Sequence, residues 1–528
     1  MMIAIEPTFI TVAPGVDTLH AALVQRRLAP GRAATLKLQR GLHQLTRPLK
    51  LDERDQDTAF EGEYGASISG GILVADWKHV ANGTWEADIP AALNTSEIGQ
   101  RMQLFRGEQR LTLARSAELK YIHAEATNVT FAGEDIRPDY YDFSQVHLVM
   151  YESWTASFHR LSSVNASTHT AYLASHYNAM WANQAAGSRY YVQNAREHLD
   201  EVGEFYIDVP RRRVMLKLAA GDAPTSGPPM MLAGPSALLQ LSGRAGAPLT
   251  RVSFAGITFE HTAAESAGVL SGADSQSADH LVTATVHVGA YTAHVTVENC
   301  TFRHTGGYAF WAGPGAANCS LTRCNAYDLG AGGVRLGGGH TASSSSTGHA
   351  ILDSTLSDGG HVWQQGAGVL AQRVAAVNIS HNEIRSFRYT GVSTGWTWGY
   401  GPTDVSDVLV SFNHIHDIGQ GYLSDMAYAR TPHTRTQAHK HHTRTLSLSS
   451  SSFSHNAFHV WQVRLHPRPP AQLARAQQLL PRCAVVQLRW VGVLHGRGLA
   501  RPPLREQRCV PHQVRGAPSA LWHRQRVA

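Results

Sequence analysis

The chain has 528 residues, of which 43% are hydrophobic and 16% charged, so it can bury a large core in a long solenoid or in more than one module. Its formal charge of +6 and pI near 9.1 come from one end. Residues 427–528 hold 16 basic residues against the single acid Glu506, whereas residues 1–426 hold 39 acidic and 30 basic residues. The acidic part excludes the basic surface typical of nucleic-acid binding. No apolar run reaches the roughly 20 residues that span a bilayer, so we expect neither a nucleic-acid nor a membrane partner.

The N-terminal segment, residues 1–76, is expected to form a cap and the first coils of a β-solenoid. The opening MMIAIEPTFITVAPG shows no basic stretch followed by an apolar core, so no signal peptide is predicted and the localisation stays open. Residues 17–28 fit a short helix with Asp17 as its N-cap. The following runs alternate apolar and polar residues and break at glycine, which is typical of short strands.

Residues 77–238 lose this alternation and are expected to form a β-rich insertion or accessory module. Strand-like aromatic segments such as GTWEADIP and WTASFHRLSSV occur here. The segment EFYIDVPRRRVMLKL predicts a hairpin that turns near Pro210 and Arg211.

Residues 239–426 repeat one short phrase. The copies are VSFAGITF, VTVENCTF, SLTRCNAY, AILDSTL, VNISHNEI and VLVSFNHI. Five of them align on Cys300, Cys324, Ser354, Asn382 and Asn413 in steps of roughly 24 to 31 residues, the length of one solenoid turn. The pattern predicts an all-β fold, a right-handed parallel β-helix of the pectin lyase type, with these residues stacked in a ladder. Cysteines at such positions indicate buried thiols rather than disulfides.

Residues 427–528 show neither strand nor helix periodicity, and we expect a disordered tail that is not natively folded. One interpretation of this segment is a basic arm that binds nucleic acid. We favour a retained intron followed by an out-of-frame exon, because the tract 428–452 looks like translated dinucleotide repeats. With permitted codons, a one-base shift also turns Leu494–Gly498 into Tyr-Thr-Asp-Glu-Gly and residues 501–514 into a further β-helix phrase.

Candidate chemistry lies in three glycine-flanked acidic segments that follow repeat phrases and contain Asp328, Asp358 and Asp425. Glycine lets the backbone approach a ligand, although each acid alone is more often a turn residue. Trp396 and Trp398 could stack on a sugar ring or could pack at a corner.

His414 and His416 could donate a proton or hold a ligand, although histidines beside a repeat phrase are more often turn or groove residues. The sequence shows no zinc, phosphate-loop or nucleophile-elbow motif, so we expect no metal and no cofactor.

The segments FAGITFEHT, ENCTFRHTGGYAFW, DLGAGGVRLGG, YTGVSTGWTWGYGP and FNHIHDIGQGYLSDM together resemble the right-handed β-helix glycoside hydrolases, which include α-L-fucosidases and xylanases. The resemblance implies an extracellular enzyme that acts on plant cell-wall polysaccharides and uses two carboxylates. It implies Asp425 as catalytic acid or nucleophile, and Asp328 as a catalytic candidate with a supporting or substrate-binding role. Substrate binding is expected at Asp358 and at the two tryptophans and two histidines named above. We expect the protein to be a monomer that binds a polysaccharide or oligosaccharide.

The chain departs from that family after the LSDM segment, where a Tyr-Thr-Asp-Glu-Gly motif exists only in the shifted frame. Glycoside hydrolysis ordinarily needs a carboxylate pair, so the polypeptide as written is expected to be catalytically incomplete. Two alternatives stay open: a non-catalytic glycan-binding or structural β-helix, and a Ca²⁺-dependent polysaccharide lyase, which loss of activity on chelation would identify.

Overall fold

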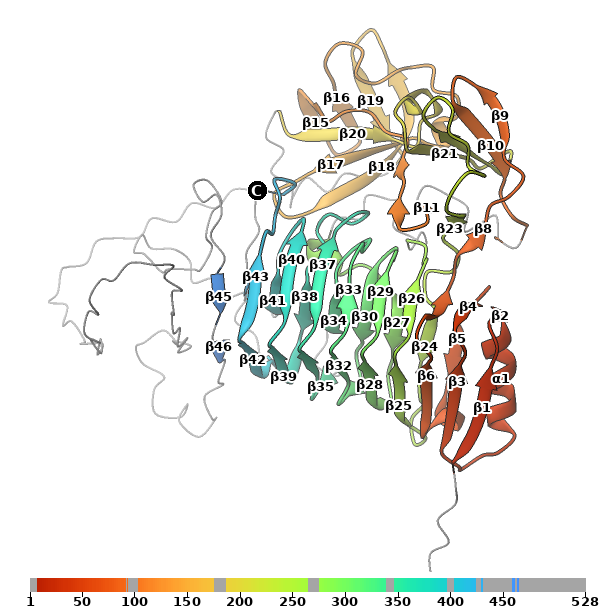
Figure 1. The fold of residues 1–528 in the computed structure, drawn as a ribbon. Coiled ribbons are helices and arrows are strands. Elements are labelled where there is room, and N and C mark those ends of the chain that lie inside the picture. The colour runs from red at the N-terminus through yellow and green to blue at the C-terminus, as the bar shows by residue number, and fades with distance from the viewer. Residues whose placement is uncertain are drawn as a thin grey trace, which may run out of the picture. The chain divides into compact units, whose positions relative to one another are not determined.

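A computed structural model describes residues 7–91, 93, 103–174, 187–264, 275–338, 346–396, 403–423, 429–430, 458–460 and 463–464. All of them lie in one compact unit, Met1–Trp490. The core of this unit is a parallel β-helix built from three sheets, here called A, B and C (Figure 1). This architecture confirms the fold predicted from the repeated phrases.

From β3 onward, each coil contributes strands to sheet A, then to sheet B, then to sheet C. Sheet A contains β1 (Thr8–Val12), β3 (Ala34–Leu38), β6 (Thr58–Gly62), β25 (Leu249–Ala255), β28 (Thr292–Glu298), β31 (Ala316–Ala317), β32 (Ser320–Thr322), β35 (Ser346–Thr347), β36 (Ala350–Leu352), β39 (Val374–Ser380) and β42 (Ser406–Ser411). Sheet B contains β2 (Gly15–Val16), β4 (Gly41–Gln44), β7 (Ala66–Ser69), β26 (Thr258–Glu260), β29 (Thr301–Arg303), β33 (Asn325–Ala326), β37 (Thr355–Gly359), β40 (Glu383–Phe387) and β43 (Asn413–His416). Sheet C contains β5 (Leu49–Leu51), β24 (Leu239–Leu241), β27 (Ala284–Val288), β30 (Tyr308–Ala312), β34 (Val334–Gly337), β38 (Val369–Gln372), β41 (Val392–Gly395) and β44 (Ala429–Arg430).

The apolar residues of each phrase point inward and stack on their equivalents in the next coil. Phe259 of β26 stacks on Phe302 of β29 with ring centroids 5.0 Å apart, and both side chains are fully buried. Val297, Leu321 and Ile351 share one parallel register in sheet A and lie in the same core cluster. Each coil therefore buries its inner face only because its neighbours cover it.

The residues at the corner between sheets A and B form the predicted ladder. The backbone N–H of Cys324 donates to Ser354 Oγ at 3.0 Å, and that of Ser354 donates to Asn382 Oδ1 at 3.0 Å. The N–H of Asn382 donates in turn to Asn413 Oδ1 at 2.9 Å. Cys300 and Cys324 are buried free thiols, which confirms the interpretation of these cysteines. Burial also raises the pKa of the third thiol, Cys319, to about 12.

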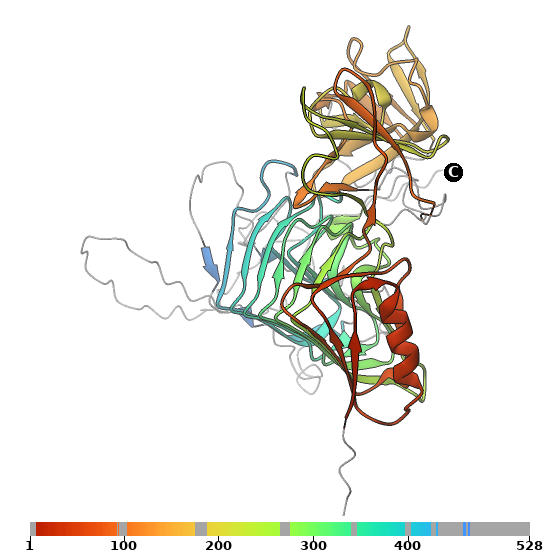
Figure 2. The same cartoon turned by 45° about the vertical axis from the view of Figure 1, so that its right-hand side comes forward.

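The helix expected near the N-terminus is α1 (Thr18–Arg27), seen at one end of the β-helix in Figure 2. It buries Leu19 and Leu23 in the main core cluster. Asp17 is the N-cap residue as predicted, but its side chain makes no capping hydrogen bond to the helix. The Asp17 carboxylate instead accepts hydrogen bonds from the N–H and hydroxyl of Thr46, at 3.1 and 2.6 Å, and so ties two coils together.

Between β7 and β24 the chain leaves the β-helix and forms further strands, entered and left through the antiparallel pair β8 (Ile72–Leu73) and β23 (Met230–Leu232) (Figure 1). The strands between these two are β9 (Lys78–Ala81), β10 (Thr84–Asp88), β11 (Leu104–Arg106), β12 (Gln109–Arg110), β13 (Thr112–Leu113), β14 (Leu119–Lys120), β15 (His123–Glu125), β16 (Asn128–Thr130), β17 (His147–Tyr151), β18 (Ala156–Asn165), β19 (Thr170–Leu173), β20 (Arg189–Gln193), β21 (Glu204–Asp208) and β22 (Arg213–Lys217). The antiparallel pair β21 and β22 confirms the predicted hairpin. We call this segment the inserted module.

At the C-terminal end, β45 (Phe458–Val460) and β46 (Val463–Arg464) pair antiparallel with β43 and β42. The parallel strand β44 also falls within the segment for which no native fold was expected. The rest of residues 427–528 lies outside the described residues. Within the part of the chain that the structure describes, no helix is both long and apolar enough to cross a membrane.

Candidate functional site

A row of polar residues with left-handed backbone lies at the C-terminal ends of the strands of sheet B, either near the end of the strand or in the turn after it. Each member lies two positions beyond the last inward-facing residue of its phrase, and each has φ between 49° and 60°. The row consists of His261, His304, Asp328, Asp358, Ser386 and Asp417. A left-handed residue with a side chain costs about 1–2 kcal/mol, and Asp and His are among the types found there most often. The same backbone conformation recurs at the corner after sheet A, at Asn299, Arg323, Asp353, His381 and Phe412, so the conformation alone does not select a site. The carboxylates and imidazoles gathered in this row make it the candidate site.

Asp328 is the most firmly held member of the row. Its Oδ1 accepts a hydrogen bond from Arg110 Nε at 2.7 Å, and its Oδ2 lies 2.6 Å from His304 Nδ1. Its side chain is only 11% exposed. Burial alone would raise the pKa of Asp328, but the charge of Arg110 and the bond to His304 outweigh it and hold the pKa well below its ordinary value. Both carboxylate oxygens are therefore already engaged, and the group is ionised.

Asp358 is the exposed neighbour of Asp328 in the next coil. Its side chain is 52% exposed, and its Oδ1 lies 2.9 Å from His361 Nε2. The same His361 nitrogen lies 3.6 Å from Asp328 Oδ1, so the histidine bridges the two acids. One oxygen or nitrogen from each of the three residues falls within 4.8 Å of the others. Burial opposes ionisation of Asp358, but His361 outweighs it and lowers the pKa of this acid as well.

A buried polar network continues the row toward the N-terminal coils. Arg303 Nε donates to Glu260 Oε2 at 2.7 Å, and its Nη1 donates to Glu108 Oε1 at 2.6 Å. His261 Nδ1 lies 3.0 Å from Ser69 Oγ, and its ring stacks on that of His304 with centroids 5.1 Å apart. Burial lowers the pKa of His261 to about 4, so this ring is neutral at pH 7. The network fixes the side chains behind Asp328.

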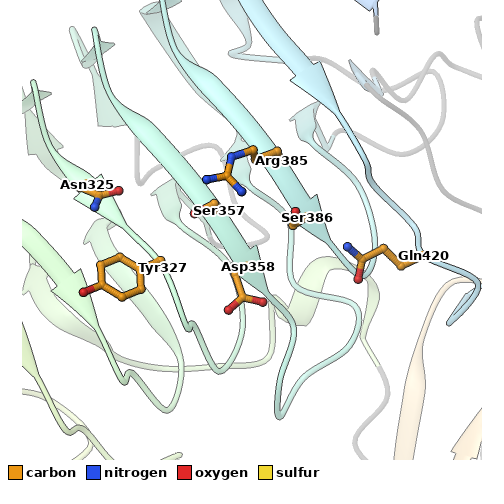
Figure 3. Close-up of a pocket in the computed structure, with 7 residues that line it drawn as sticks. All are labelled: Asn325, Tyr327, Ser357, Asp358, Arg385, Ser386 and Gln420. Atoms are coloured by element: carbon orange, nitrogen blue, oxygen red, sulfur yellow. The ribbon is translucent and has the colours of Figure 1, made fainter. Parts of the chain in front are cut away.

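The outer face of sheet B carries an open groove of about 630 Å³ beside these acids. Its lining is polar except for one aromatic ring, and Figure 3 shows the side chains spread over neighbouring strands and the turns after them. The lining residues are Asn325, Tyr327, Ser357, Asp358, Arg385, Ser386 and Gln420. Amide, hydroxyl, carboxylate and guanidinium groups around one ring provide both hydrogen bonds and a flat apolar surface.

The glycines around Asp328 serve the packing of coils against each other. A Cβ on Gly330 would lie 2.2 Å from the carbonyl oxygen of Gly306, and one on Gly332 would lie 2.0 Å from that of Ala367. The sequence suggested that such glycines let the backbone approach a ligand. The structure shows instead that they let adjacent coils approach each other.

The structure brings only some of the predicted site residues together. Asp328 and Asp358 lie close together and Asp358 lines the groove, whereas Asp425 and Trp398 lie outside the described residues. Trp396 is half-buried, donates from Nε1 to Ser393 Oγ at 3.0 Å, and packs against an aromatic cluster that contains Trp363 and Tyr389. It is not among the residues that line the groove.

His414 and His416 lie on β43, and their stacked rings have centroids 4.2 Å apart. They share a cluster with Glu383 of β40, and neither lines the groove.

Pattern analysis missed several residues of the site. Arg110 and Glu108 come from the inserted module, and no period in the sequence relates them to the coils. His304, Tyr327 and Arg385 could have been found by extending the alignment of the repeated phrases by one or two positions.

The comparisons with known proteins agree with this geometry. The family model described as "Right handed beta helix region" matches residues 286–459. The chain is a right-handed parallel β-helix protein. A solved structure described as a glycoside hydrolase shares the fold with a TM-score of 0.66 at 19% identity, over 80% of this chain and 85% of that one.

Two further structures overlap too weakly to carry an argument. A complex of XylC with xylose has a TM-score of 0.42 at 10% identity, over 78% of this chain and 62% of that one. The Gp54 tailspike of Acinetobacter baumannii bacteriophage AP22, in complex with capsular saccharide, has a TM-score of 0.23 at 8% identity, over 79% of this chain and 63% of that one. No curated protein sequence matches the chain.

Proposed function

We propose that this chain is a carbohydrate-active β-helix protein, related to glycoside hydrolases that act on plant cell-wall polysaccharides, and that it binds polysaccharide in the groove on sheet B. The observation that carries the proposal is the open polar groove with Tyr327 among its hydrogen-bonding side chains. An open groove accommodates a long chain that extends beyond the site at both ends. The fold shared with a glycoside hydrolase is consistent with this substrate class.

We further propose that the polypeptide as written binds its glycan without efficient turnover. Asp328 and Asp358 are as close as the two carboxyl groups of a retaining enzyme, which lie about 5 Å apart. Such a pair needs one acid that is protonated near neutral pH, and this requires a raised pKa. The pKa values of Asp328 and Asp358 are both lowered, which is the opposite of what a general acid needs. Hydrolysis would then depend on Asp425 and on a second acid that the reading frame does not supply.

Affinity measurements on purified protein test the binding proposal. Xylan, pectin and xyloglucan fragments are titrated calorimetrically into the full-length chain and into Tyr327→Ala, which removes the ring from the groove. We expect binding of at least one polysaccharide, weakened about 5-fold or more in the variant, since a stacked ring contributes about 1–3 kcal/mol. Tyr291→Ala is the matched control, because Tyr291 is 53% exposed and does not line the groove. Equal weakening in both variants, or no binding at all, contradicts the proposal.

Product analysis of the same mixtures tests the catalytic part. We expect no increase in reducing ends above the buffer control. Rapid release of saturated oligosaccharides would contradict catalytic incompleteness, and release of unsaturated products abolished by a chelator would identify a lyase.

The reading frame is tested by sequencing full-length transcripts across the codons for residues 426–460. A major spliced form that removes the tract 428–452 and restores Tyr-Thr-Asp-Glu-Gly supports the proposal of a retained intron. Transcripts that match this chain throughout refute it.

A further inference from the structure

Two histidines and a glutamate form a cluster on the outer face of sheet B, on the strands β40 and β43, whose coils also contribute Arg385, Ser386 and Gln420 to the groove. His414 and His416 alternate along β43, so their side chains leave the same face of the sheet. Glu383 on the neighbouring strand β40 is the register partner of His414. All three residues are half-buried, so solvent reaches the cluster.

The potential donor atoms lie close together. One from each residue falls within 4.8 Å of the other two. His416 Nε2 lies 3.2 Å from Glu383 Oε1, close to the roughly 3.3 Å that separates two ligands of a tetrahedral ion with bonds of about 2.0–2.1 Å. Two histidines separated by one residue on a strand, with a third donor from the next strand, can therefore converge on one ion through small side-chain rotations.

A neighbouring carboxylate orients one of these rings. His416 Nδ1 lies 2.8 Å from Asp417 Oδ2, which leaves Nε2 directed toward Glu383. Histidine ligands of metal ions usually have their second nitrogen held by a carboxylate or carbonyl in this way. The guanidinium of Arg385 places a positive charge beside the cluster and would disfavour a bound cation, since its Nε lies 3.2 Å from the same Glu383 oxygen. The carboxylates of Glu383 and Asp417 together exceed this single positive charge.

We propose that Glu383, His414 and His416 bind a zinc ion, with the remaining coordination position open to solvent. Two imidazole nitrogens and one carboxylate suit Zn²⁺ and related transition-metal ions, whereas Ca²⁺ and Mg²⁺ prefer oxygen ligands. The site goes beyond polysaccharide binding, because none of its three residues lines the groove. Bound zinc would cross-link β40 to β43 and would present a Lewis-acidic, water-bearing position on the surface of the coil.

Two other clusters of the described residues have potential donor atoms at similar spacing, but they are weaker candidates for a zinc site. Asp328, Asp358 and His361 belong to the site described above, where Arg110 and His304 already engage both oxygens of Asp328. In the cluster of Glu260, His261 and His304, both carboxylate oxygens of Glu260 are already engaged, one by Arg303 and the other by Ser67.

Zinc titration of the full-length chain tests the proposal. The segment after residue 426 contains further histidines that can bind zinc, so the readout is the difference between variants rather than the total. The variants are Glu383→Gln, His414→Ala and His416→Ala, with Zn²⁺ titrated against a competing chromophoric chelator. We expect each variant to lose one zinc equivalent or to bind that zinc at least 10-fold more weakly. Even the loss of a residue that only orients a metal ligand typically weakens metal binding by about 10- to 100-fold.

His381→Ala is the matched control, since His381 is exposed at a corner of the same coil and stacks on Phe412 with centroids 5.0 Å apart. It should keep the full zinc stoichiometry and affinity. Co²⁺ gives a second readout: the wild-type chain should show the intense visible absorption of a four-coordinate nitrogen and oxygen site, and His416→Ala should lose that component.

Unchanged zinc stoichiometry and affinity in His416→Ala and Glu383→Gln, with circular dichroism like that of wild type, overturn the proposal. Equal loss in His381→Ala also overturns it. If a test variant does not fold, the Co²⁺ spectrum of the wild-type chain decides, because absence of the four-coordinate signal refutes the site.

Discussion

Asp328→Asn is expected to destabilise the β-helix strongly, although asparagine has nearly the same shape and tolerates the left-handed backbone of residue 328. The change removes a negative charge but leaves Arg110 buried beside it, with side chains 10% and 11% exposed in the wild-type pair. Removing one partner of a buried ion pair costs about 3–5 kcal/mol. Asp57→Asn is the matched control. Asp57 also has a positive φ and pairs with Arg251, but at side-chain exposures of 36% and 59%, where such a pair is worth only about 0–1 kcal/mol.

Hydrogen exchange measured by mass spectrometry can compare the loss of local stability in the two variants. The N–H of Tyr327 donates to Phe302 O at 3.0 Å, so peptides covering β33 report opening at the site. Protection there should fall by roughly 100-fold to several thousand-fold in Asp328→Asn, because 1.36 kcal/mol corresponds to a factor of ten. Peptides around residue 57 should change by less than about 10-fold in the control. A loss in Asp328→Asn no larger than in Asp57→Asn would refute the structural role assigned to the Arg110 pair.

The same pair has a defined pH dependence. The folded pKa of Asp328 lies below its unfolded value of about 3.9, so its stabilisation is fully present above that pH and is lost as the pH falls toward the folded pKa. The stability difference between wild type and Asp328→Asn should therefore be constant near neutral pH and narrow below about pH 4. A difference that widens on acidification contradicts the assignment.

Three further predictions concern the coils. Asn382→Ala removes the side chain that accepts a hydrogen bond from the N–H of Ser354 and donates one to the carbonyl oxygen of Ile351. The free energy of unfolding measured by hydrogen exchange should therefore fall by about 2–4 kcal/mol. A decrease below about 0.5 kcal/mol would refute the stabilising role of the ladder. Gly306→Ala should abolish or severely reduce soluble yield, because its Cβ would lie 2.0 Å from the backbone of Ala263. Gly307→Ala is the control and should behave like wild type, because the nearest atom to its Cβ lies 3.6 Å away. Equal soluble yields of the two variants would contradict the packing argument. Cys300, Cys319 and Cys324 should resist alkylation in the native chain and react after denaturation, as peptide mapping would show, and rapid native labelling of these three would contradict their burial.

The β-helix could be predicted from sequence because its information is local and repeated. Each phrase carries its own inward residues and its own corner residue, so alignment of the phrases yields both the core and the ladder. Asn382 and Asn413 were predicted to stack for this reason, and their hydrogen bonds confirm it. The corner conformation of Asp17 could not be predicted in this way, because its partner Thr46 lies in the next coil rather than in the helix it precedes.

The candidate site was only partly predictable. Asp328 and Asp358 occur at the same position of successive phrases, and this repeat brings them together. Arg110, which neutralises Asp328, is separated from it by 218 positions and enters from the inserted module. Only the three-dimensional structure can show that contact, and it changes Asp328 from an accessible acid into a buried, paired one. The need for glycine at Gly330 and Gly332 is likewise visible only in the structure, where the backbone of a neighbouring coil leaves no room for a Cβ.

The most direct test of polysaccharide binding is a hydrogen-exchange footprint of the full-length chain with a saturating cell-wall oligosaccharide identified by titration. The account predicts added protection around Tyr327, which follows β33, and around Asp358 and Ser386 at the C-terminal ends of β37 and β40, and no change in the hairpin of β21 and β22. Protection confined to the inserted module, or absent from all three of these places at saturation, would contradict the assignment of the groove on sheet B as the glycan site.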